Sequence, residues 1–292
     1  MKEIAIIGST ASGKTGLSLD IAQKTNSIIL SLDSLSVYKE IDIASAKPTI
    51  EERGDIIHFG IDEVYPNEEF DVIQFIDCYK KAKEYALQNN NNLIIVGGTG
   101  FYLKALVEGL SVGVDSKIKL DIPVEEAYDL LYSLDKDYME RIKKTDRYRV
   151  EKAYAIYKDS QLTPSEYFKQ NPKTPIAPDL KIFEILWDRD ELRKRISLRT
   201  KLMMKDGIID EVIYLERKYT REPNAMSSIG IIETLEFLDG KINKEQLEEK
   251  VALNTAKLAK RQNTFNKGQF NGKQESNIIQ NLNSDILKYF SL

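Results

Sequence analysis

The sequence predicts an α/β fold built on a parallel sheet, and three short apolar runs support this prediction. The runs span residues 4–7, 27–32 and 93–96, and they lead directly into a glycine, an aspartate and a second glycine. Runs of this length without polar alternation are typical of strands that are buried on both faces. Helical periodicity follows the first run and precedes the third. Strands that alternate with helices form a parallel sheet.

The remaining elements of the core follow from the spacing of apolar residues. Residues 180–187 alternate in part and predict a fourth strand. Helices are expected around Leu17, Ile21 and Ala22, and at 70–87, 191–205, 208–218, 229–238 and 244–265. The Asn- and Gln-rich tail after Gln262 is expected to be partly frayed.

Between about residue 111 and about residue 177 the strand-like runs disappear. Amphipathic patterns predict short helices at 124–134, 136–144 and 148–158, and three prolines at 172, 175 and 178 mark the end of the segment. We therefore expect a helical insertion domain at 111–177 within an α/β core formed by residues 1–110 and 178–292.

Composition excludes several classes of protein. The 292 residues include one Cys and one His, which excludes an internal disulfide and the usual Cys/His zinc site. No segment has the roughly 20 apolar residues needed to cross a bilayer, and the N-terminus does not fit a signal peptide. A cytoplasmic protein without a membrane partner is expected.

The formal net charge of −4 conceals three basic segments. Residues 141–149 carry five Lys and Arg against one acid, residues 191–205 carry six against one, and residues 251–273 carry five against none. Contacts with phosphate depend on local lysines and arginines rather than on the total charge. RNA therefore remains a possible partner, and it fits best if the three segments share one face.

Residues 8–15 match the pattern G-x-x-x-x-G-K-[ST], with a predicted strand before them and a helix after them. In such a loop the backbone N–H groups and the helix N-terminus converge on phosphate oxygens. Lys14 adds a positive charge, and the Thr15 hydroxyl can reach a bound magnesium ion. The predicted di- or triphosphate site consists of Gly8, Ser9, Thr10, Ala11, Ser12, Gly13, Lys14 and Thr15.

The residues at the ends of two other predicted strands do not decide which reaction the site would carry out. Enzymes that bind ATP or GTP in this way usually have a second strand that ends in a magnesium-binding Asp, but here the third run ends in Gly97-Gly98-Thr99-Gly100. Asp33, after the second run, could be a metal ligand, a general base or only a turn residue. Thr99 could donate a hydrogen bond to a phosphate oxygen or only form a turn.

Several further segments, in order, carry a resemblance to one family. They are residues 31–34, 37–38, 42–48, 58–62, 70–72, 96–102, 106–110 and 260–262. Together with the loop at 8–15, they resemble the bacterial tRNA dimethylallyltransferases from residue 1 to about residue 265. The match is dense in the first 110 residues and thin in the insertion.

The resemblance implies a P-loop-kinase-like core with a helical insertion that contacts the tRNA anticodon stem. It also implies transfer of a dimethylallyl group from dimethylallyl diphosphate to N6 of the adenine at tRNA position 37. That adenine lies 3′ of the anticodon in tRNAs that read codons starting with U. Mg2+ is the implied cofactor, and we expect a monomer.

The resemblance also implies roles for individual residues. The loop at 8–15 binds the diphosphate with Thr15 at the metal, Asp33 is the general base, and Thr99 contacts the bridging oxygen of the diphosphate. Arg199 binds the diphosphate, with Arg195 as the alternative one helical turn away. The implied tRNA contacts are Asp33, Ser34, Leu35, Ser36, Tyr148, Arg149, Val150, Glu151 and Lys152.

This chain departs from the family pattern at two places. Residues 227–232 read Ser-Ser-Ile-Gly-Ile-Ile, where many members have basic residues around a Gly-Tyr pair, so contact with RNA there stays open. Phe265 lies near the position of the family's tryptophan and could equally be a core aromatic. Helix packing is the favoured role of the tyrosines at 148, 154 and 157, and structural roles are favoured for His58 and Cys78.

Three other functions compete with this one. They are prenylation of a free adenine nucleotide, phosphoryl transfer by a small-molecule kinase, and non-catalytic nucleotide binding. A free nucleotide does not need the wide contact surface that a helical insertion provides, which counts against the first of these functions. The missing carboxylate at the end of the third run counts against the other two.

Overall fold

The computed structural model describes residues 1–111 and 120–291. The chain divides into two compact units, one formed by Met1–Lys104 and Asp179–Leu292 and one by Ala105–Pro178. They are called the core unit and the inserted unit below. Within the described ranges, no helix is long and apolar enough to cross a membrane.

The core unit is built on a six-stranded parallel sheet with the order β3-β2-β4-β1-β5-β6. The strands are β1 (Glu3–Gly8), β2 (Ser27–Leu32), β3 (His58–Phe59), β4 (Asn92–Gly97), β5 (Lys181–Ile185) and β6 (Gln274–Ser276). Ile4 of β1 lies opposite Ile94 of β4 and Lys181 of β5. The predicted parallel α/β sheet is confirmed, and its four expected strands are β1, β2, β4 and β5.

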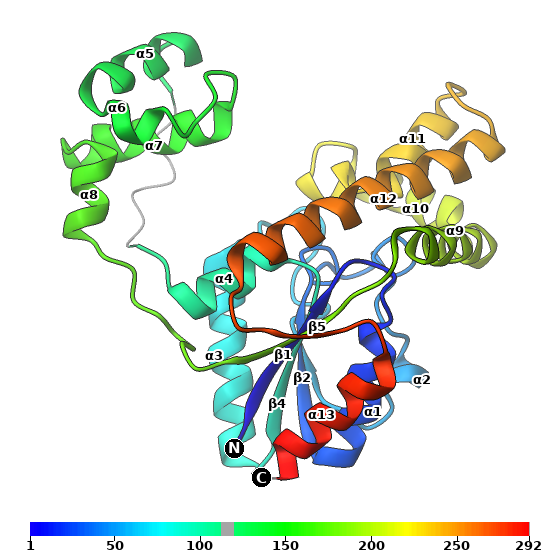
Figure 1. The fold of residues 1–292 in the computed structure, drawn as a ribbon. Coiled ribbons are helices and arrows are strands. Elements are labelled where there is room, and N and C mark those ends of the chain that lie inside the picture. The colour runs from blue at the N-terminus through cyan, green and yellow to red at the C-terminus, as the bar shows by residue number, and fades with distance from the viewer. Residues whose placement is uncertain (112–119, 292) are drawn as a thin grey trace. The chain divides into compact units, whose positions relative to one another are not determined.

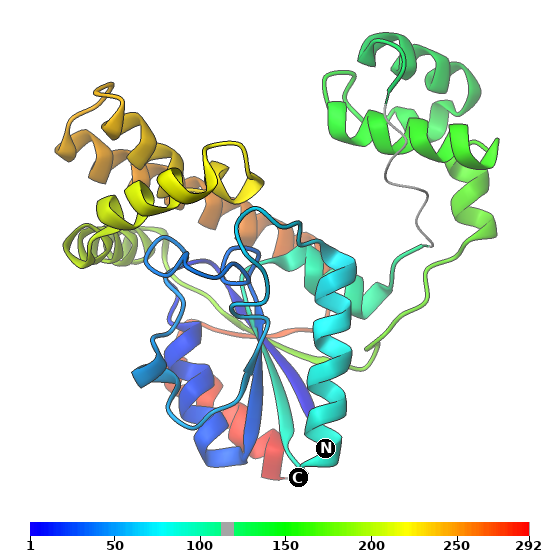
Figure 2. The same cartoon turned by 180° about the vertical axis from the view of Figure 1, so that it is seen from behind.

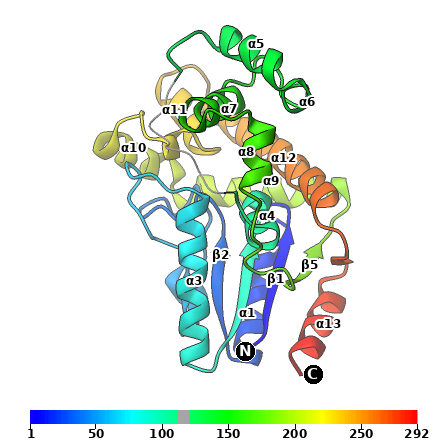
Figure 3. The ribbon, with the colours of Figure 1, turned by 90° about the vertical axis from the view of Figure 1, so that its left-hand side faces the viewer.

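Helices cover both faces of the sheet (Figures 1 and 3). On one face, α1 (Lys14–Thr25) and α13 (Ile279–Ser291) pack against β1, β2, β4 and β5 through one apolar cluster. On the other face, α3 (Val72–Gln88) packs against β2 and β4. Asp71 begins α3 with a capping box, which is the sequence signal for a helix start there.

The expectation of a frayed tail is wrong. Residues after α12 (Lys244–Gln269) form β6, which pairs with β5, and then α13, whose Leu282 and Ile286 are fully buried in the sheet cluster. The Asn- and Gln-rich composition hides these two apolar residues, which lie four apart on one helix face. The tail therefore completes the core rather than leaving it.

The remaining helices of the core unit lie mainly beyond the carboxyl ends of the strands (Figure 2). They are α2 (Ile50–Arg53), α4 (Gly100–Glu108), α9 (Arg189–Asp206), α10 (Ile208–Tyr219), the 3₁₀ helix η1 (Asn224–Ser227), α11 (Ile231–Leu238) and α12 (Lys244–Gln269). α4 ends across the boundary with the inserted unit. Helix α9 packs against α12. Gly207, at a φ of 98°, ends α9 and begins α10, a conformation that glycine adopts without strain.

The inserted unit consists of short helices around its own small core. They are α5 (Val124–Leu134), α6 (Lys136–Met139), α7 (Arg147–Ser160) and α8 (Pro164–Gln170). The helix expected at 136–144 is shorter than predicted, because the N–H groups of Arg141 and Ile142 bond to carbonyls three residues back and tighten the chain. Residues 112–119 of the expected insertion lie outside the described residues.

The two ends of the inserted unit are hydrogen-bonded to each other. The Leu106 carbonyl accepts the N–H groups of Ile176 and Ala177 at 2.9 and 2.8 Å. Gly109, at a φ of 81°, lies so close to the Thr174 backbone that a Cβ would not fit. The segments that lead into and out of this unit therefore run together.

Candidate active site

The loop at residues 8–15 connects β1 to α1 and has the geometry of a phosphate-binding loop. Gly13 lies in the left-handed region at a φ of 92°, and a Cβ on Gly8 would lie 2.8 Å from the Ile185 carbonyl oxygen. Lys14 Nζ donates to the Ser9 carbonyl at 2.6 Å. The glycines therefore allow a turn that side chains at those positions would block.

Two side chains brace the outer side of this loop. Trp187 Nε1 donates to the Ser12 carbonyl at 2.8 Å, and Arg195 Nε donates to the Ala11 carbonyl at 2.8 Å. The Arg195 guanidinium also lies 4.5 Å from the centre of the Trp187 ring. Arg195 is therefore engaged with the loop backbone and with an aromatic face.

Arg199, one turn further along α9, reaches a different place. Its Nη1 donates to the Thr10 hydroxyl at 3.1 Å and its Nη2 to the Ser45 carbonyl at 3.4 Å. Burial lowers the pKa of Arg199, and the nearby Asp33 carboxylate opposes that shift. The structure thus separates the two arginines that the sequence left as alternatives.

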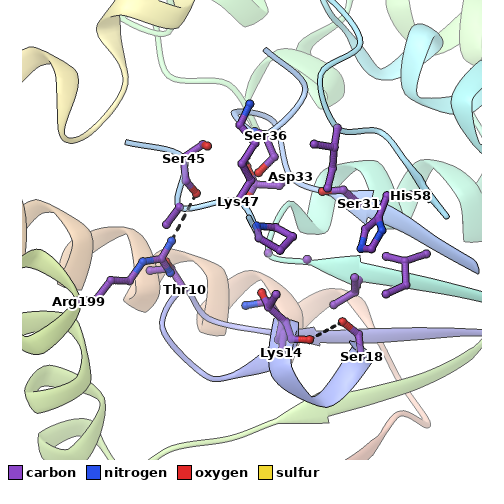
Figure 4. Close-up of a pocket in the computed structure, with 18 of the residues that line it drawn as sticks. Thr10, Lys14, Ser18, Ser31, Asp33, Ser36, Ser45, Lys47, His58 and Arg199 are labelled. Atoms are coloured by element: carbon purple, nitrogen blue, oxygen red, sulfur yellow. Dashed lines mark hydrogen bonds between the residues drawn. The ribbon is translucent and has the colours of Figure 1, made fainter. Parts of the chain in front are cut away.

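A pocket, here called the P-loop pocket, opens beside this loop (Figure 4). It is lined by Thr10, Lys14, Thr15, Ser18, Ile29, Ser31, Asp33, Ser36, Ser45, Ala46, Lys47, Pro48, His58, Ile61, Val96, Gly97, Gly98, Arg199 and Gln262. An adjoining, larger open groove is bounded by α9, α12, residues 224–229 and the start of α4. The pocket and the groove share Thr10, Asp33, Ser45, Gly98, Arg199 and Gln262.

The electrostatics of the P-loop pocket favour an anion. Burial, the largest cause, and the positive charge of Arg199 together lower the pKa of Lys14 to about 7, against the opposing effect of Asp33 and Glu184. The positive charges of Lys14 and Arg199 therefore repel each other at short range. A bound anion would relieve this repulsion.

Asp33 follows β2 and both closes a turn and lines the two cavities. Its Oδ1 accepts the N–H groups of Leu35 and Ser36 at 2.8 and 3.2 Å. Asp33 also borders the P-loop pocket and the groove. The turn role and a chemical role, which the sequence offered as alternatives, are compatible with one carboxylate.

Thr99 follows β4 and is tied to the same turn. Its hydroxyl oxygen accepts the Ser34 N–H at 3.2 Å, and its own N–H donates to the Leu32 carbonyl at 3.1 Å. Gly97 lies so close to Leu32 that a Cβ would not fit between the strands. The ends of β2 and β4 therefore place Asp33 and Thr99 beside the same groove.

Two residues that border the pocket were missed as site residues by the sequence analysis. Gln262 Oε1 accepts the Thr10 N–H at 2.8 Å, and its amide fills the space beside Gly98. Lys47 is buried, and its ammonium group bonds to the Tyr38 carbonyl at 2.9 Å and to Asp42 and Asp62. Both residues lie in segments that carry the family resemblance, and this resemblance is the only sequence feature that could have identified them as site residues.

The two residues for which structural roles were favoured differ in position. His58 lies on β3, borders the P-loop pocket and places Nδ1 2.8 Å from the Ile56 carbonyl oxygen; burial lowers its pKa. Cys78 lies buried in α3, and burial raises the pKa of its thiol to about 11. A thiol in that state is not a nucleophile at neutral pH.

The segments that depart from the family pattern border the groove. Ser227, Ser228 and Ile229 line it, and so does Phe265, which packs edge-on against Phe270 at 6.3 Å. Phe265 also occupies the space beside Gly100. It is therefore both a groove residue and part of the local packing.

Residues 148–152 form the first turns of α7 in the inserted unit. Tyr148 is 69% exposed, and Lys152 Nζ lies 5.8 Å from the centre of its ring. Val150 is fully buried in the core of this unit, so its side chain cannot reach a ligand. The role of Tyr148 in helix packing is wrong, since its ring faces solvent, whereas Tyr154 is buried as expected.

Comparison with known proteins matches this architecture to one family. The family model described as IPP transferase matches residues 36–269. A protein of Aliarcobacter butzleri named tRNA dimethylallyltransferase is 75% identical over the whole length of both chains. One of the same name from Sulfurimonas denitrificans is 52% identical over 92% of this chain and 93% of its own.

Solved structures agree. The tRNA isopentenylpyrophosphate transferase of Staphylococcus epidermidis superposes with a TM-score of 0.72 at 28% identity, covering 100% of this chain and 99% of its own. A eukaryotic dimethylallyltransferase acting on tRNA has a TM-score of 0.79 at 28% identity, covering 91% and 70%. With the phosphate-binding loop in place and a matching model over most of its length, the chain belongs to the IPP transferase family.

Proposed function

We propose that this enzyme transfers a dimethylallyl group from dimethylallyl diphosphate to N6 of the adenine at tRNA position 37, with release of diphosphate. The adenine is the one 3′ of the anticodon in tRNAs that read codons starting with U. One observation carries the proposal: an anion-binding pocket and a wide groove meet at Thr10, Asp33 and Arg199. The names of the relatives support the same reaction.

The diphosphate is held by the loop at 8–15. Backbone N–H groups and the N-terminus of α1 favour anionic oxygens there. Lys14 and Arg199 add two positive charges on the pocket side. These charges stabilise the leaving diphosphate as the bond between C1 and oxygen breaks.

Asp33 is the general base in this proposal. The exocyclic amine of adenine is a poor nucleophile, so a positioned carboxylate that takes its proton helps the carbon–nitrogen bond to form. The electron pair of the broken C1–O bond leaves with the diphosphate. Oδ1 is occupied by two backbone N–H groups, which leaves the second oxygen for the amine proton.

Thr99 contacts the bridging oxygen of the diphosphate. Its hydroxyl oxygen accepts the Ser34 N–H, so its own O–H is left to donate. A neutral donor stabilises the charge that develops on this oxygen without binding the substrate tightly before the reaction.

Mg2+ fits the donors present around Thr15. Among the described residues, no three or more His, Cys, Asp and Glu side chains are arranged so that they could hold a metal ion by themselves. Magnesium instead favours one or two protein oxygens together with phosphate oxygens and water. The Thr15 hydroxyl would hold it, and the ion would supply charge neutralisation at the diphosphate.

The tRNA enters from the groove. The adenine must leave its stack to reach Asp33, and Ser34 and Leu35 line the groove beside it. We propose that the inserted unit contacts the anticodon stem through Tyr148, Arg149 and Lys152. Residues 227–229 border the groove, which supports a contact between them and the anticodon loop.

A label-transfer experiment tests this function. Radiolabelled dimethylallyl diphosphate is incubated with the enzyme and either bulk tRNA or AMP, and the tRNA nucleosides are then analysed by mass. Dimethylallyl adenosine in tRNA and unlabelled AMP are expected. Label in AMP alone would indicate a free-nucleotide enzyme, and phosphate transfer from ATP would indicate a kinase.

A further inference from the structure

The turn at residues 42–48 forms one wall of the P-loop pocket. Ser45, Ala46, Lys47 and Pro48 line the pocket, and Ser45 also lines the groove. The Ser45 carbonyl accepts Nη2 of Arg199 at 3.4 Å. The position of this turn therefore helps to decide where the guanidinium points.

One carboxylate from outside the turn accepts three of its backbone N–H groups. Glu211 Oε2 accepts the N–H groups of Asp42 and Ile43 at 2.9 and 2.7 Å, and Oε1 accepts the N–H of Ala44 at 2.9 Å. Glu211 lies in the first turn of α10, and it does not line the P-loop pocket or the groove.

Three successive N–H groups that point the same way need an acceptor outside their own turn. An ionised carboxylate provides two oxygens and forms stronger hydrogen bonds than a neutral acceptor. Leaving even one such donor without a partner costs free energy, because the N–H group has lost its water. Glu211 is therefore well suited to fix the backbone at residues 42–44.

The same turn has two other attachments, which limit its freedom at the far end. Lys47 bonds to the Tyr38 carbonyl and to two aspartates, and the Ser45 hydroxyl donates back to the Ile41 carbonyl. Arg199 on α9 and Glu211 on α10, which flank the helix break at Gly207, both form hydrogen bonds with the backbone of the turn. The helix pair α9–α10 thus contacts the turn at adjacent residues.

We propose that Glu211 is a positioning residue for the prenyl transfer. By holding the backbone at 42–44, it keeps the Ser45 carbonyl where it orients Arg199 toward the diphosphate. Glu211 acts through Arg199 and contacts no substrate. The inference rests on the proposed function.

Glu211→Gln tests the inference, with Asp210→Asn as the matched control. Each change removes one negative charge from the first turn of α10, but Asp210 is exposed and does not contact the turn at 42–48. A glutamine has one carbonyl oxygen, and its NH2 group faces an N–H donor, so at least one hydrogen bond is lost. We expect kcat/KM for dimethylallyl diphosphate to fall about tenfold or more, with KM for tRNA within about twofold. Asp210→Asn should match the wild type.

A double-mutant cycle with Arg199→Ala separates positioning from general structural support. If Glu211 acts through Arg199, Glu211→Gln changes the single-turnover rate by less than about twofold in the Arg199→Ala background. An equal loss in both backgrounds, or a Glu211→Gln enzyme as active as Asp210→Asn, overturns the inference. Circular dichroism checks folding, and if Glu211→Gln does not fold, Glu211→Asp takes its place in the cycle. Failure of the wild type to label tRNA would instead overturn the proposed function.

Discussion

The Asp33 carboxylate combines a structural and a chemical position, and this shapes how it should be tested. Its Oδ1 closes the turn at Leu35 and Ser36, so an alanine would remove the base and loosen the turn together. Asn keeps a carbonyl oxygen for both N–H groups and removes only the basic oxygen. The comparison of the two variants therefore separates the roles.

We expect Asp33→Asn to lower turnover by about 10² or more, because it removes the proposed general base and keeps the turn. Binding of tRNA should stay within about twofold. Single-turnover rates and a tRNA filter-binding assay measure the two quantities. Turnover close to that of the wild type would show that the carboxylate serves only the turn.

The pKa of Lys14, lowered to about 7 by burial and by Arg199, predicts a pH-dependent affinity. Above pH 7 the free enzyme increasingly holds Lys14 neutral, whereas a bound diphosphate favours its charged form. Binding should therefore take up a proton. The Kd for dimethylallyl diphosphate should rise by up to about tenfold per pH unit from about pH 7 to about pH 9.

Calorimetric titrations in buffers with different ionisation enthalpies measure this proton uptake directly. The same titrations at several pH values give the Kd. A Kd that stays constant over this range, without proton uptake, would contradict the predicted state of Lys14.

At the residue scale, the sequence predicts the members of the site better than their contacts. The loop at 8–15 is recognisable because a fixed pattern of glycines is needed for its turn. The separate positions of Arg195 and Arg199 depend on how α9 packs against the loop, which no local pattern encodes. The contact of Gln262 with Thr10 joins residues 252 positions apart, so the same limit applies to it.

At the scale of elements, a local sequence pattern predicts some strands of the sheet and not others. Three of the four strands predicted from sequence are buried apolar runs, and the fourth, β5, alternates in part. In contrast, β3 and β6 have only two and three residues and contain polar side chains. Their place in the sheet comes from pairing with β2 and β5 rather than from their own pattern. α13 was missed because the Asn- and Gln-rich stretch before and within it obscures an apolar stripe at helical spacing, which includes Ile279, Leu282 and Ile286.

The element β6 is fixed to the core by an ion pair whose loss should be measurable. Lys273 Nζ lies 3.0 Å from Glu184 Oε2, and both side chains are almost fully buried. Lys273→Met leaves the Glu184 carboxylate without its cation, and we expect the free energy of unfolding to fall by about 3 kcal/mol. Urea denaturation followed by circular dichroism measures this change.

The control for this prediction is the double variant Glu184→Gln with Lys273→Met. It removes both charges, so most of the lost stability should return. A Lys273→Met protein as stable as the wild type would mean that Asn266, which also bonds to Glu184, satisfies the carboxylate alone.

At the scale of the whole molecule, the basic segments differ in how much charge they present. All five basic residues at 141–149 are exposed, and three of them, Lys144, Arg147 and Arg149, form only surface ion pairs, which water and salt weaken. Lys273 is instead buried against Glu184 and pairs with Glu275 as well. The count of charges in the sequence therefore overestimates the positive charge that the segment at 251–273 presents to a ligand. The segment at 141–149 is the better candidate for contact with the phosphates of tRNA.

Replacing the five basic residues at 141–149 with Gln should weaken tRNA binding and its dependence on salt. The slope of log affinity against log salt concentration should fall by about 1 for each phosphate contact that is lost. The Kd for dimethylallyl diphosphate, measured without tRNA, is the internal control and should not change. An unchanged salt slope would show that this segment does not contact the tRNA backbone.

The hydrogen bonds that close the inserted unit at Leu106 determine how the fold tolerates changes in the length of that unit. Because the chain leaves and returns at Leu106 and residues 176–177, the segment between them could lengthen, shorten or be exchanged without shifting the register of any strand. The length and sequence of this segment are therefore independent of the sheet, so the inserted unit can be varied separately from the core unit.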